Sequence, residues 1–235
     1  MIVAGANVLV TGANRGLGAA LVEALLARGA STVYAAARDP RGLDHPDPRV
    51  VPLRLDVTEL ATVRAAAERA DDVDVVINNA GVGGAGSLLT TDPERARAEM
   101  ETNFWGPVAV TRAFAPVLAR RGGGALVTVL SALSWAAMPA AGSYSATKAA
   151  AWSFTNTARA ELRDQGVQVV GVHLGFMDTD MVAHLDVPKI AAPEVAEAVL
   201  DGVESGAEEV LADAPSRGLK EALAGPPQGL ELAGR

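Results

Sequence analysis

Tyr144 and Lys148 are the residues of this chain whose types and spacing point most directly to chemistry. The run Ser143–Arg163 is predicted to be helical, and a spacing of four places both side chains on one face, one turn apart. An ammonium beside a phenol favours the phenolate, and it is expected to lower the tyrosine pKa from about 10 towards neutrality. A tyrosine tuned in this way can act as a general acid or base. The same spacing also occurs in plain helix-surface pairs, so the rest of the chain has to support the chemical interpretation.

A glycine-rich turn, T-G-A-N-R-G-L-G, follows a strand predicted over Asn7–Val10 and leads into a helix. Gly12 permits the sharp turn, Gly16 lets the backbone approach a pyrophosphate, and Gly18 allows close packing of the helix on the sheet. The helix N-terminus offers free N–H groups to phosphates. This position favours a dinucleotide-binding turn over a simple loop. The residues of the turn expected to bind the cofactor are Gly12, Asn14, Arg15, Gly16, Leu17 and Gly18.

Arg38 follows the second predicted strand, where an acidic residue would accept a hydrogen bond from the 2′-hydroxyl of an NAD(H) ribose. An arginine can instead pair with a 2′-phosphate, and Arg15 of the glycine turn could supply a second cation. Asp39 comes next, so the local charge is mixed, and two solvated arginines are the alternative interpretation. The predicted cofactor is therefore NADP(H), with NAD(H) as the alternative.

Two further strand ends supply candidate cofactor contacts. Asp56 and Val57 follow the third predicted strand, where a carboxylate and a backbone amide could contact an adenine. Asn79, Ala80 and Gly81 follow the fourth, where small residues leave room for a ribose. Both segments also have a purely structural interpretation, because aspartate and asparagine are common in turns and caps.

Short β-type runs alternate with longer helical patterns along nearly the whole chain. Runs such as Val73–Ile77 and Ala125–Leu130 show no in/out alternation, which is typical of strands covered on both faces. The alternation of strands with helices implies a parallel sheet with right-handed crossovers, and ligands then bind at the carboxyl ends of the strands. The predicted strands are Asn7–Val10, Thr32–Ala36, Val51–Leu55, Val73–Ile77, Ala125–Leu130, Val167–Val172 and Glu209–Ala212, and the predicted helices are Leu17–Arg28, Thr58–Ala70 with Thr58 as N-cap, one within Asp92–Arg120, Ser143–Arg163 and Pro193–Val203.

These elements predict one α/β domain over residues 1–235, a doubly wound Rossmann-type fold with about seven parallel strands and helices on both faces. Residues from about 215 to 235 are expected to form a short C-terminal helix and tail.

Composition excludes several function classes. The 235 residues are 49% hydrophobic and carry a formal charge of −8, which argues against nucleic acid as the main partner. There is no cysteine, and the three histidines are scattered, so neither disulfides nor a zinc site are expected. No apolar run approaches the roughly 20 residues of a membrane span. We therefore expect a soluble, cytoplasmic protein without a metal ion.

Three motifs occur in the order and spacing of one enzyme family: T-G-x-x-x-G-x-G, N-N-A-G and Y-x-x-x-K. From Asn7 to Met181 the chain resembles the short-chain dehydrogenase/reductase family. Ser131, thirteen residues before Tyr144 (144 − 131), matches a further catalytic position of that family, and so does Asn103 in the long predicted helix. Ser134 is a rival for the serine role, but it precedes the tyrosine by only ten residues, which fits the family less well.

The resemblance implies a mechanism and a role for each residue. Ser131 would hold the substrate oxygen, and Tyr144 would exchange a proton with it. Lys148 would bind the nicotinamide ribose and lower the tyrosine pKa, and Asn103 would hold a water that connects Lys148 to solvent. The cofactor itself transfers the hydride.

The segment after the sixth predicted strand departs from the family pattern, which usually has Pro-Gly followed by a threonine. This chain reads H-L-G-F-M-D-T, with Leu174 in place of the proline. Leucine has a backbone N–H and no ring that restricts φ, so the conformation of the loop is less constrained. The sequence leaves open how this replacement affects nicotinamide binding. Gly175 and Thr179 are still assigned to the nicotinamide end of the cofactor.

Mostly apolar residues flank the proposed catalytic groups: Leu133, Trp135, Met138, Met177, Met181 and His184. Methionine and tryptophan suit an adaptable apolar pocket, although core packing uses the same residue types. No arginine pair marks a carboxylate or phosphate substrate. A neutral, hydrophobic ketone, aldehyde or secondary alcohol is therefore favoured as the substrate.

The main functional hypothesis is an NADP(H)-dependent carbonyl reductase or alcohol dehydrogenase. One alternative is a non-catalytic NADP(H)-binding sensor or scaffold, against which the intact set of serine, tyrosine, lysine and asparagine argues. Another alternative keeps the cofactor but changes the chemistry to that of a dehydratase or epimerase. The family commonly pairs the helices that carry Asn103 and Tyr144 across a two-fold axis. Because apolar residues are spread around both helices, a homodimer or homotetramer is expected.

Overall fold

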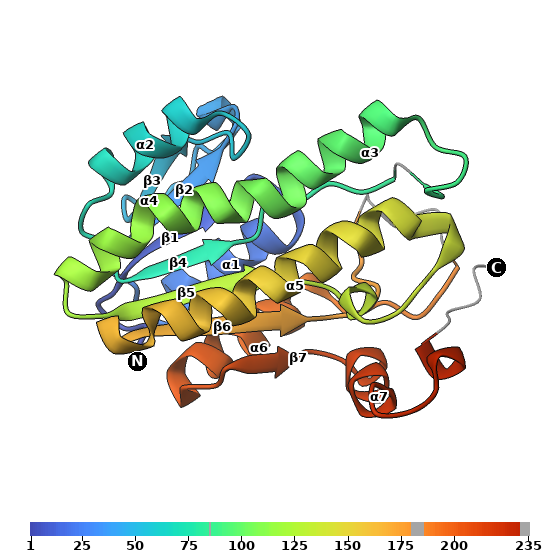
Figure 1. The fold of residues 1–235 in the computed structure, drawn as a ribbon. Coiled ribbons are helices and arrows are strands. Elements are labelled where there is room, and N and C mark those ends of the chain that lie inside the picture. The colour runs from blue at the N-terminus through green and yellow to red at the C-terminus, as the bar shows by residue number, and fades with distance from the viewer. Residues whose placement is uncertain (85, 180–185, 231–235) are drawn as a thin grey trace.

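The computed structural model describes residues 1–84, 86–179 and 186–230, and within these ranges the strands form one seven-stranded sheet (Figure 1). Neighbouring strands are parallel, and their order is β3-β2-β1-β4-β5-β6-β7. The strands are β1 (Asn7–Thr11), β2 (Thr32–Ala37), β3 (Val50–Arg54), β4 (Val75–Asn78), β5 (Gly124–Val129), β6 (Val167–His173) and β7 (Glu209–Leu211). The doubly wound parallel sheet predicted from the alternation of elements is confirmed.

Helices cover both faces of the sheet, as predicted. They are α1 (Gly16–Ala27), α2 (Leu60–Arg69), α3 (Pro93–Met100), α4 (Gly106–Arg120), α5 (Gly142–Leu162), α6 (Ala192–Ser205) and α7 (Ala214–Ala222). One face carries α2, α4 and α5, and the other carries α1 and α6 (Figure 1). In the described ranges, no helix is both long and apolar enough to cross a membrane.

The pleat of the strands explains why their sequences are apolar throughout. In β1, Val8 and Val10 pack with residues of α1 and α6, whereas Leu9 between them packs with residues of α2 and α4. All three side chains are fully buried. Because both faces are covered, neither set of alternating positions is exposed to water.

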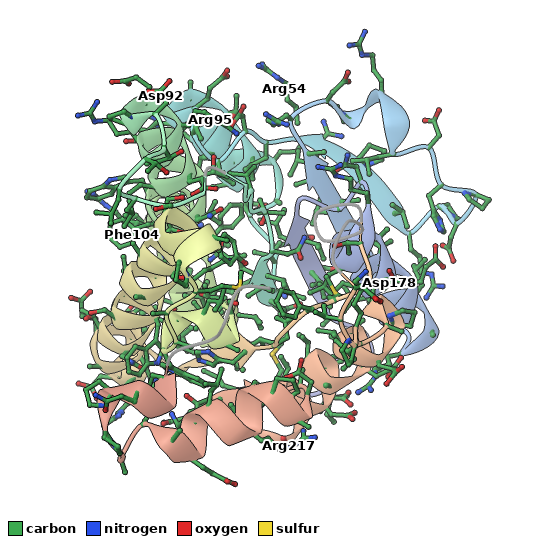
Figure 2. All side chains as sticks on the ribbon, turned by 90° about the vertical axis from the view of Figure 1, so that its right-hand side faces the viewer. Arg54, Asp92, Arg95, Phe104, Asp178 and Arg217 are labelled. Carbon is green, nitrogen blue, oxygen red and sulfur yellow. The ribbon has the colours of Figure 1, made fainter. Side chains whose placement is uncertain are left out.

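The strand order reverses at β1, whose neighbours are β2 and β4. In doubly wound sheets, ligands bind beyond the carboxyl ends of the strands at such a reversal. Figure 1 shows this edge on its right-hand side, and Figure 2 looks directly at it. In that view Asp92 and Arg95 of α3 lie on one flank, and Arg217 of α7 lies on the other. The proposed site residues have to meet at this edge.

The long helix predicted within Asp92–Arg120 is divided into three parts. Between α3 and α4, the residues Glu101–Trp105 form a π-helical segment. Pro107 lies in the first turn of α4, and because proline has no N–H it cannot close the regular hydrogen bond to the carbonyl of Asn103. The widened segment carries Asn103 into the interior, where it is 1% exposed.

The start of α2 shows that Thr58 is not its N-cap, contrary to the prediction. The helix begins at Leu60, after Glu59, whose side chain makes no capping hydrogen bond. The Oδ1 atom of Asp56 instead accepts from the backbone N of Thr58 at 2.9 Å and from its hydroxyl at 2.7 Å. This local turn holds the threonine hydroxyl away from the helix terminus.

Candidate active site

Ser131 and Tyr144 are brought together at the carboxyl edge, although they belong to different elements. Ser131 follows β5 and begins the 3-10 turn Ala132–Ser134, where its Oγ atom accepts from the backbone N of Leu133 at 3.1 Å. Tyr144 lies in the first turn of α5. The Ser131 hydroxyl is close enough to the phenol of Tyr144 to lower the pKa of that phenol. The predicted serine–tyrosine pair is therefore assembled in the described structure.

Ser134, the rival serine, has a different task. Its Oγ atom accepts from the backbone N of Ser131 at 3.3 Å, which completes a capping box around the turn. Both serines are buried, but Ser131 is the serine whose hydroxyl lowers the pKa of the Tyr144 phenol.

The pKa of Tyr144 is raised to about 12, and the lowering predicted from the lysine spacing does not occur in this geometry. Burial is the main cause because it disfavours the charged phenolate, and the hydrogen bond from Ser131 opposes it. The negative charge of Glu99 raises the pKa further. The phenol is therefore protonated at neutral pH in this geometry.

Lys148 is not among the groups that shift the tyrosine pKa, and no hydrogen bond joins it to the phenol among the described contacts. Its Nζ atom lies 5.6 Å from the centroid of the Tyr144 ring and donates to the carbonyl oxygen of Val129 at 2.8 Å. The residue is 5% exposed, and burial lowers the pKa of its ammonium to about 8. An added Cβ on Gly81 would lie 3.8 Å from the same Nζ atom. The lysine thus binds the end of β5 and lies near the segment after β4.

Asn103 is the residue through which the π-helical segment meets the site. Its Oδ1 atom accepts from the backbone N of Val82 at 2.8 Å. Its Nδ2 atom donates to the carbonyl of Val82 at 2.8 Å and to Oγ1 of Thr147 at 3.0 Å. Thr147 in turn donates to the carbonyl of Tyr144 at 2.8 Å. The side-chain amide therefore links the segment after β4 to the helix turn that carries the tyrosine.

The glycine turn has a backbone geometry that depends on glycine at three positions. Gly12 and Gly16 have φ values of 66° and 54°, which favour glycine. An added Cβ on Gly18 would lie 2.0 Å from the carbonyl oxygen of Gly12, so no side chain fits there. The first turn of α1 has no side-chain cap from Arg15, and Asn14, Arg15 and Gly16 are exposed. Backbone N–H groups at this helix start can accommodate a phosphate.

Asn79 and Thr11 hold the glycine turn in place. The Asn79 side-chain amide donates to the carbonyls of Thr11 at 2.8 Å and Gly12 at 3.2 Å. The hydroxyl of Thr11 accepts from the backbone N atoms of Asn79 and Ala80 at 3.0 and 3.1 Å. These contacts tie the end of β1 to the end of β4. These contacts give Asn79 a structural role, which is the alternative to cofactor binding.

The end of β2 presents Arg38 to solvent. The neighbouring Asp39 is paired with Arg41, whose Nε and Nη2 atoms lie 2.8 and 2.6 Å from its carboxylate oxygens. The hydrogen bonds from Arg41 lower the pKa of Asp39 to about 2. The carboxylate of Asp39 is therefore paired with Arg41 rather than with Arg38.

Three other predicted cofactor contacts have internal partners. Asp56 accepts from Thr58, as described above, and Val57 is 8% exposed and packs against Gly106 at the start of α4. The backbone N of Gly175 donates to Oδ2 of Asp213 at 2.6 Å.

Thr179 lies beside the glycine turn, although the two segments are far apart in the sequence. An added Cβ on Gly16 would lie 3.3 Å from the Thr179 Cγ2 atom. The threonine hydroxyl donates to the carbonyl of Met177 at 3.3 Å. The segment after β6 therefore approaches the turn after β1, as a cofactor-binding role for Thr179 requires.

The predicted substrate-pocket residues do not share one environment. Leu133 and Trp135 are buried at 8% exposure, and the partly buried Met138 packs with them and with residues of α7. Met177 packs instead against the core beside α1 and α6. Met181 and His184 lie outside the described residues. Trp135 is stacked at 3.8 Å on His173, which makes it a packing residue in this structure.

Glu99 was not singled out from the sequence. It is 4% exposed, and its Oε2 atom accepts from the hydroxyl of Ser143 at 2.5 Å. The same hydroxyl lies 3.2 Å from the carbonyl of Gly86, so these residues tie α3 and the segment before it to the start of α5. In the sequence, a glutamate among arginines on a helix resembles a solvated charge, and only the packing of α3 on α5 makes it internal.

A doubly wound parallel sheet with a glycine turn between its first strand and helix is the Rossmann-type arrangement. The model of the short chain dehydrogenase family matches residues 6–189, and this chain belongs to that family. A short chain dehydrogenase of Monascus ruber, pigC, is 34% identical over 199 residues, which are 77% of this chain and 66% of that relative. This chain thus spans just under two thirds of that relative's length. An uncharacterized oxidoreductase of Myxococcus xanthus is 34% identical over 201 residues, which are 81% of this chain and 79% of the relative.

A solved structure supports the same assignment. The chain is similar to a short chain dehydrogenase from Burkholderia cenocepacia J2315, which was solved in complex with NADP. The two are 46% identical with a TM-score of 0.94, and the match covers 98% of this chain and 97% of that one.

Proposed function

We propose that this protein is an NADP(H)-dependent oxidoreductase that interconverts a carbonyl and an alcohol. The observation that carries the proposal is the proximity of the Ser131 hydroxyl to the phenol of Tyr144, with the buried Lys148 one helix turn away. The pair lies at the carboxyl edge of the sheet, to which the glycine turn also belongs. A protein that only binds a dinucleotide does not need such a pair.

In this mechanism Tyr144 is the general acid for reduction and the general base for oxidation. Ser131 holds the substrate oxygen through its hydroxyl and orients the carbonyl towards the phenol. Lys148 binds the nicotinamide ribose and supplies a positive charge near the phenol. Asn103 positions a water beside Lys148 for proton exchange with solvent.

The residues of the glycine turn fit a dinucleotide. The positive φ values of Gly12 and Gly16 and the 2.0 Å approach at Gly18 leave backbone N–H groups, rather than side chains, at the start of α1. Gly12, Asn14, Arg15, Gly16, Leu17 and Gly18 hold the pyrophosphate, Asp56, Val57, Asn79, Ala80 and Gly81 line the adenosine and ribose parts, and Gly175 and Thr179 hold the nicotinamide end. The bound cofactor supplies or accepts the hydride.

The preference for NADP(H) over NAD(H) rests on Arg38. Its guanidinium is exposed at the end of β2, and the nearby carboxylate of Asp39 is occupied by Arg41. The 46% identical relative from Burkholderia cenocepacia was solved with NADP, which supports the same cofactor here. Arg15 is a second cation on this side of the turn.

The proposed substrate is a small, neutral and hydrophobic ketone, aldehyde or secondary alcohol. Leu133 and Met138 belong to the apolar cluster that also contains Tyr144, which supports an apolar substrate end. We also propose that the protein is a single domain and that it functions in the cytoplasm as a homodimer or homotetramer.

A cofactor-consumption screen tests the proposal. Purified protein is mixed with NADPH or NADH and a panel of ketones and aldehydes, and the loss of absorbance of the reduced cofactor is followed. We expect turnover with NADPH and at least one apolar carbonyl, and a loss of about 100-fold or more in Tyr144→Phe with cofactor affinity changed only a few fold. A wild type that binds NADPH but consumes none would favour a sensor or scaffold. Conversion of substrate without net cofactor use would favour a dehydratase or epimerase.

A further inference from the structure

His173 is a fully buried ionisable residue to which the proposed mechanism gives no role. It is the last residue of β6, and its Nδ1 atom lies 3.0 Å from the carbonyl oxygen of Ser131, 42 residues earlier in the chain. A carbonyl oxygen can only accept, so the Nδ1 atom carries the proton and donates. The same carbonyl also accepts from the backbone N of Ser134 at 2.9 Å. The ring therefore contributes to fixing the backbone at Ser131, whose hydroxyl lies near Tyr144.

The other ring nitrogen, Nε2, indicates that the imidazole has a role beyond packing. In the tautomer that donates from Nδ1, Nε2 is an acceptor, and it is buried without a hydrogen-bond partner among the described residues. The nearest carboxylate oxygen, Oε1 of Glu209, lies 3.7 Å away and has no proton to donate. An apolar side chain in this position would fill the space without burying an unsatisfied acceptor. The Nδ1 hydrogen bond is the interaction that offsets this burial.

Packing fixes the orientation of the ring. Trp135 is stacked on His173 at 3.8 Å and 21°, and its own ring meets Trp152 edge-on at 6.1 Å. Nζ of Lys220 lies 5.0 Å from the indole centroid of Trp135 and is paired with Glu209 at 2.8 Å. The stacking fixes the plane of the imidazole, and the hydrogen bond from Nδ1 selects the ring edge that faces Ser131.

The charge state of His173 is compatible with a fixed donor. Burial lowers the pKa of its imidazole to about 4. Glu209 on β7 opposes that shift, whereas Lys220 on α7 and Lys148 on α5 contribute to it. At neutral pH the ring is neutral, and its one proton is committed to the Ser131 carbonyl.

We infer that His173 is a positioning residue for Ser131: its Nδ1–H holds the Ser131 carbonyl and thereby places the serine hydroxyl beside Tyr144. This inference rests on the proposed function, because the position of the serine hydroxyl matters only if it holds a substrate oxygen. His173 touches neither substrate nor cofactor in this role. It acts through the backbone of the residue that does.

Three substitutions separate the hydrogen bond from the packing. His173→Asn places an amide N–H close to the former Nδ1 position, His173→Gln reaches towards the Nε2 position, and His173→Leu fills the space without a donor. We expect kcat to fall about tenfold or more in His173→Leu and His173→Gln and to recover in His173→Asn, while the KM for NADPH stays within about twofold. His45→Asn is the matched control, because His45 lies on the surface beside Glu23. Equal kcat values in all three variants, or losses that follow only thermal stability, would overturn the inference.

A measurement without turnover distinguishes this inference from the proposed function. In protein labelled with ¹⁵N-histidine, the resonances lost in His173→Leu identify His173, and their shifts report its tautomer. We expect a neutral ring protonated at Nδ1 at pH 7. A ring protonated at Nε2, or a charged ring, would overturn the inference even if the enzyme were active. If the wild type shows the expected tautomer but reduces no carbonyl, the result would support the described hydrogen bond. It would also count against the proposed reaction.

Discussion

Tyr144 and Lys148 share a helix face, but their ionisable groups have different surroundings. The pKa of the phenol is affected by the Ser131 hydroxyl and by the negative charge of Glu99, whereas the ammonium donates to the carbonyl of Val129. Burial raises the pKa of the tyrosine and lowers that of the lysine, because it disfavours the charged form of each group. At neutral pH this arrangement holds a protonated phenol, which suits a proton donor in carbonyl reduction.

The buried Lys148 should make stability depend on pH in the alkaline range. Its pKa is about 8 in the folded protein, against about 10.4 in an unfolded chain. Between these values the unfolded chain binds more protons, so the free energy of unfolding should rise as the pH rises from 8 to about 10.4. At pH 7 the buried charge costs up to about 3 kcal/mol. Lys148→Met should therefore gain stability relative to the wild type at pH 7 and lose most of that gain near pH 10.

Urea unfolding of the wild type and Lys148→Met at pH 7 and 9.5 measures this difference. Lys189→Met serves as the control, because Lys189 is not among the buried residues. A difference between wild type and Lys148→Met that does not change with pH would show that the lysine is not buried as described.

At the scale of elements, α1 depends on glycine at its start. An added Cβ on Gly18 would lie 2.0 Å from the Gly12 carbonyl oxygen, whereas an added Cβ on Gly218 in α7 would meet no atom within 4 Å. Gly18→Ala should therefore displace the turn, reduce NADP(H) affinity by about tenfold or more and lower the melting temperature. Gly218→Ala should leave binding unchanged and add about 0.5–1 kcal/mol of helix stability. Fluorescence titration and thermal melting of both variants check the prediction, and wild-type binding by Gly18→Ala would refute it.

The end of β2 should decide the cofactor preference. A charge-assisted contact from Arg38 to a 2′-phosphate is worth about 1.5–3 kcal/mol, or roughly 10- to 150-fold in affinity. Ala37→Asp together with Arg38→Leu should weaken NADP(H) binding and improve NAD(H) binding relative to it, through lost attraction and added repulsion. Arg54→Leu is the control, because Arg54 is an exposed arginine at the end of the neighbouring strand β3 (Figure 2). Calorimetric titration with both cofactors would contradict the prediction if the ratio of affinities did not change.

At the scale of the whole molecule, a cluster of aromatic side chains lies at the surface beside α4 and α5. Trp105 is 51% exposed, and the ring of Phe104 contacts both Trp105 at 4.7 Å and Phe154 of α5 at 6.4 Å. Figure 2 shows Phe104 on the outer side of these helices. Exposed aromatic residues on paired helices are typical of a surface covered by a partner.

We therefore predict that the protein sediments as a homodimer or larger at tens of micromolar, and that Trp105→Glu shifts it towards monomer. A buried glutamate without a partner would destabilise the interface. Leu60→Glu is the matched control, since Leu60 on α2 is 59% exposed but lies away from these aromatic residues. A monomeric wild type, or equal effects of both substitutions, would argue against an interface at this surface.

The sequence by itself determined the fold and allowed a set of site residues to be predicted. Strand and helix periodicities are local properties, and the requirement for glycine after β1 depends on backbone geometry over a few residues. The spacing of Tyr144 and Lys148 likewise follows from the helix they share. The expected sheet, the glycine turn and the meeting of Ser131 with Tyr144 are found in the structure.

Only the tertiary structure decided the pKa values and the contacts of these groups. The pKa of Tyr144 depends on burial and on Glu99, which belongs to another helix, and no spacing in the sequence encodes that distance. The packing of Trp135 and the contact of His173 with Ser131 are decided in the same way, by neighbours brought together at the edge of the sheet. Electrostatic and packing energies depend on these separations in space, which a linear sequence does not contain.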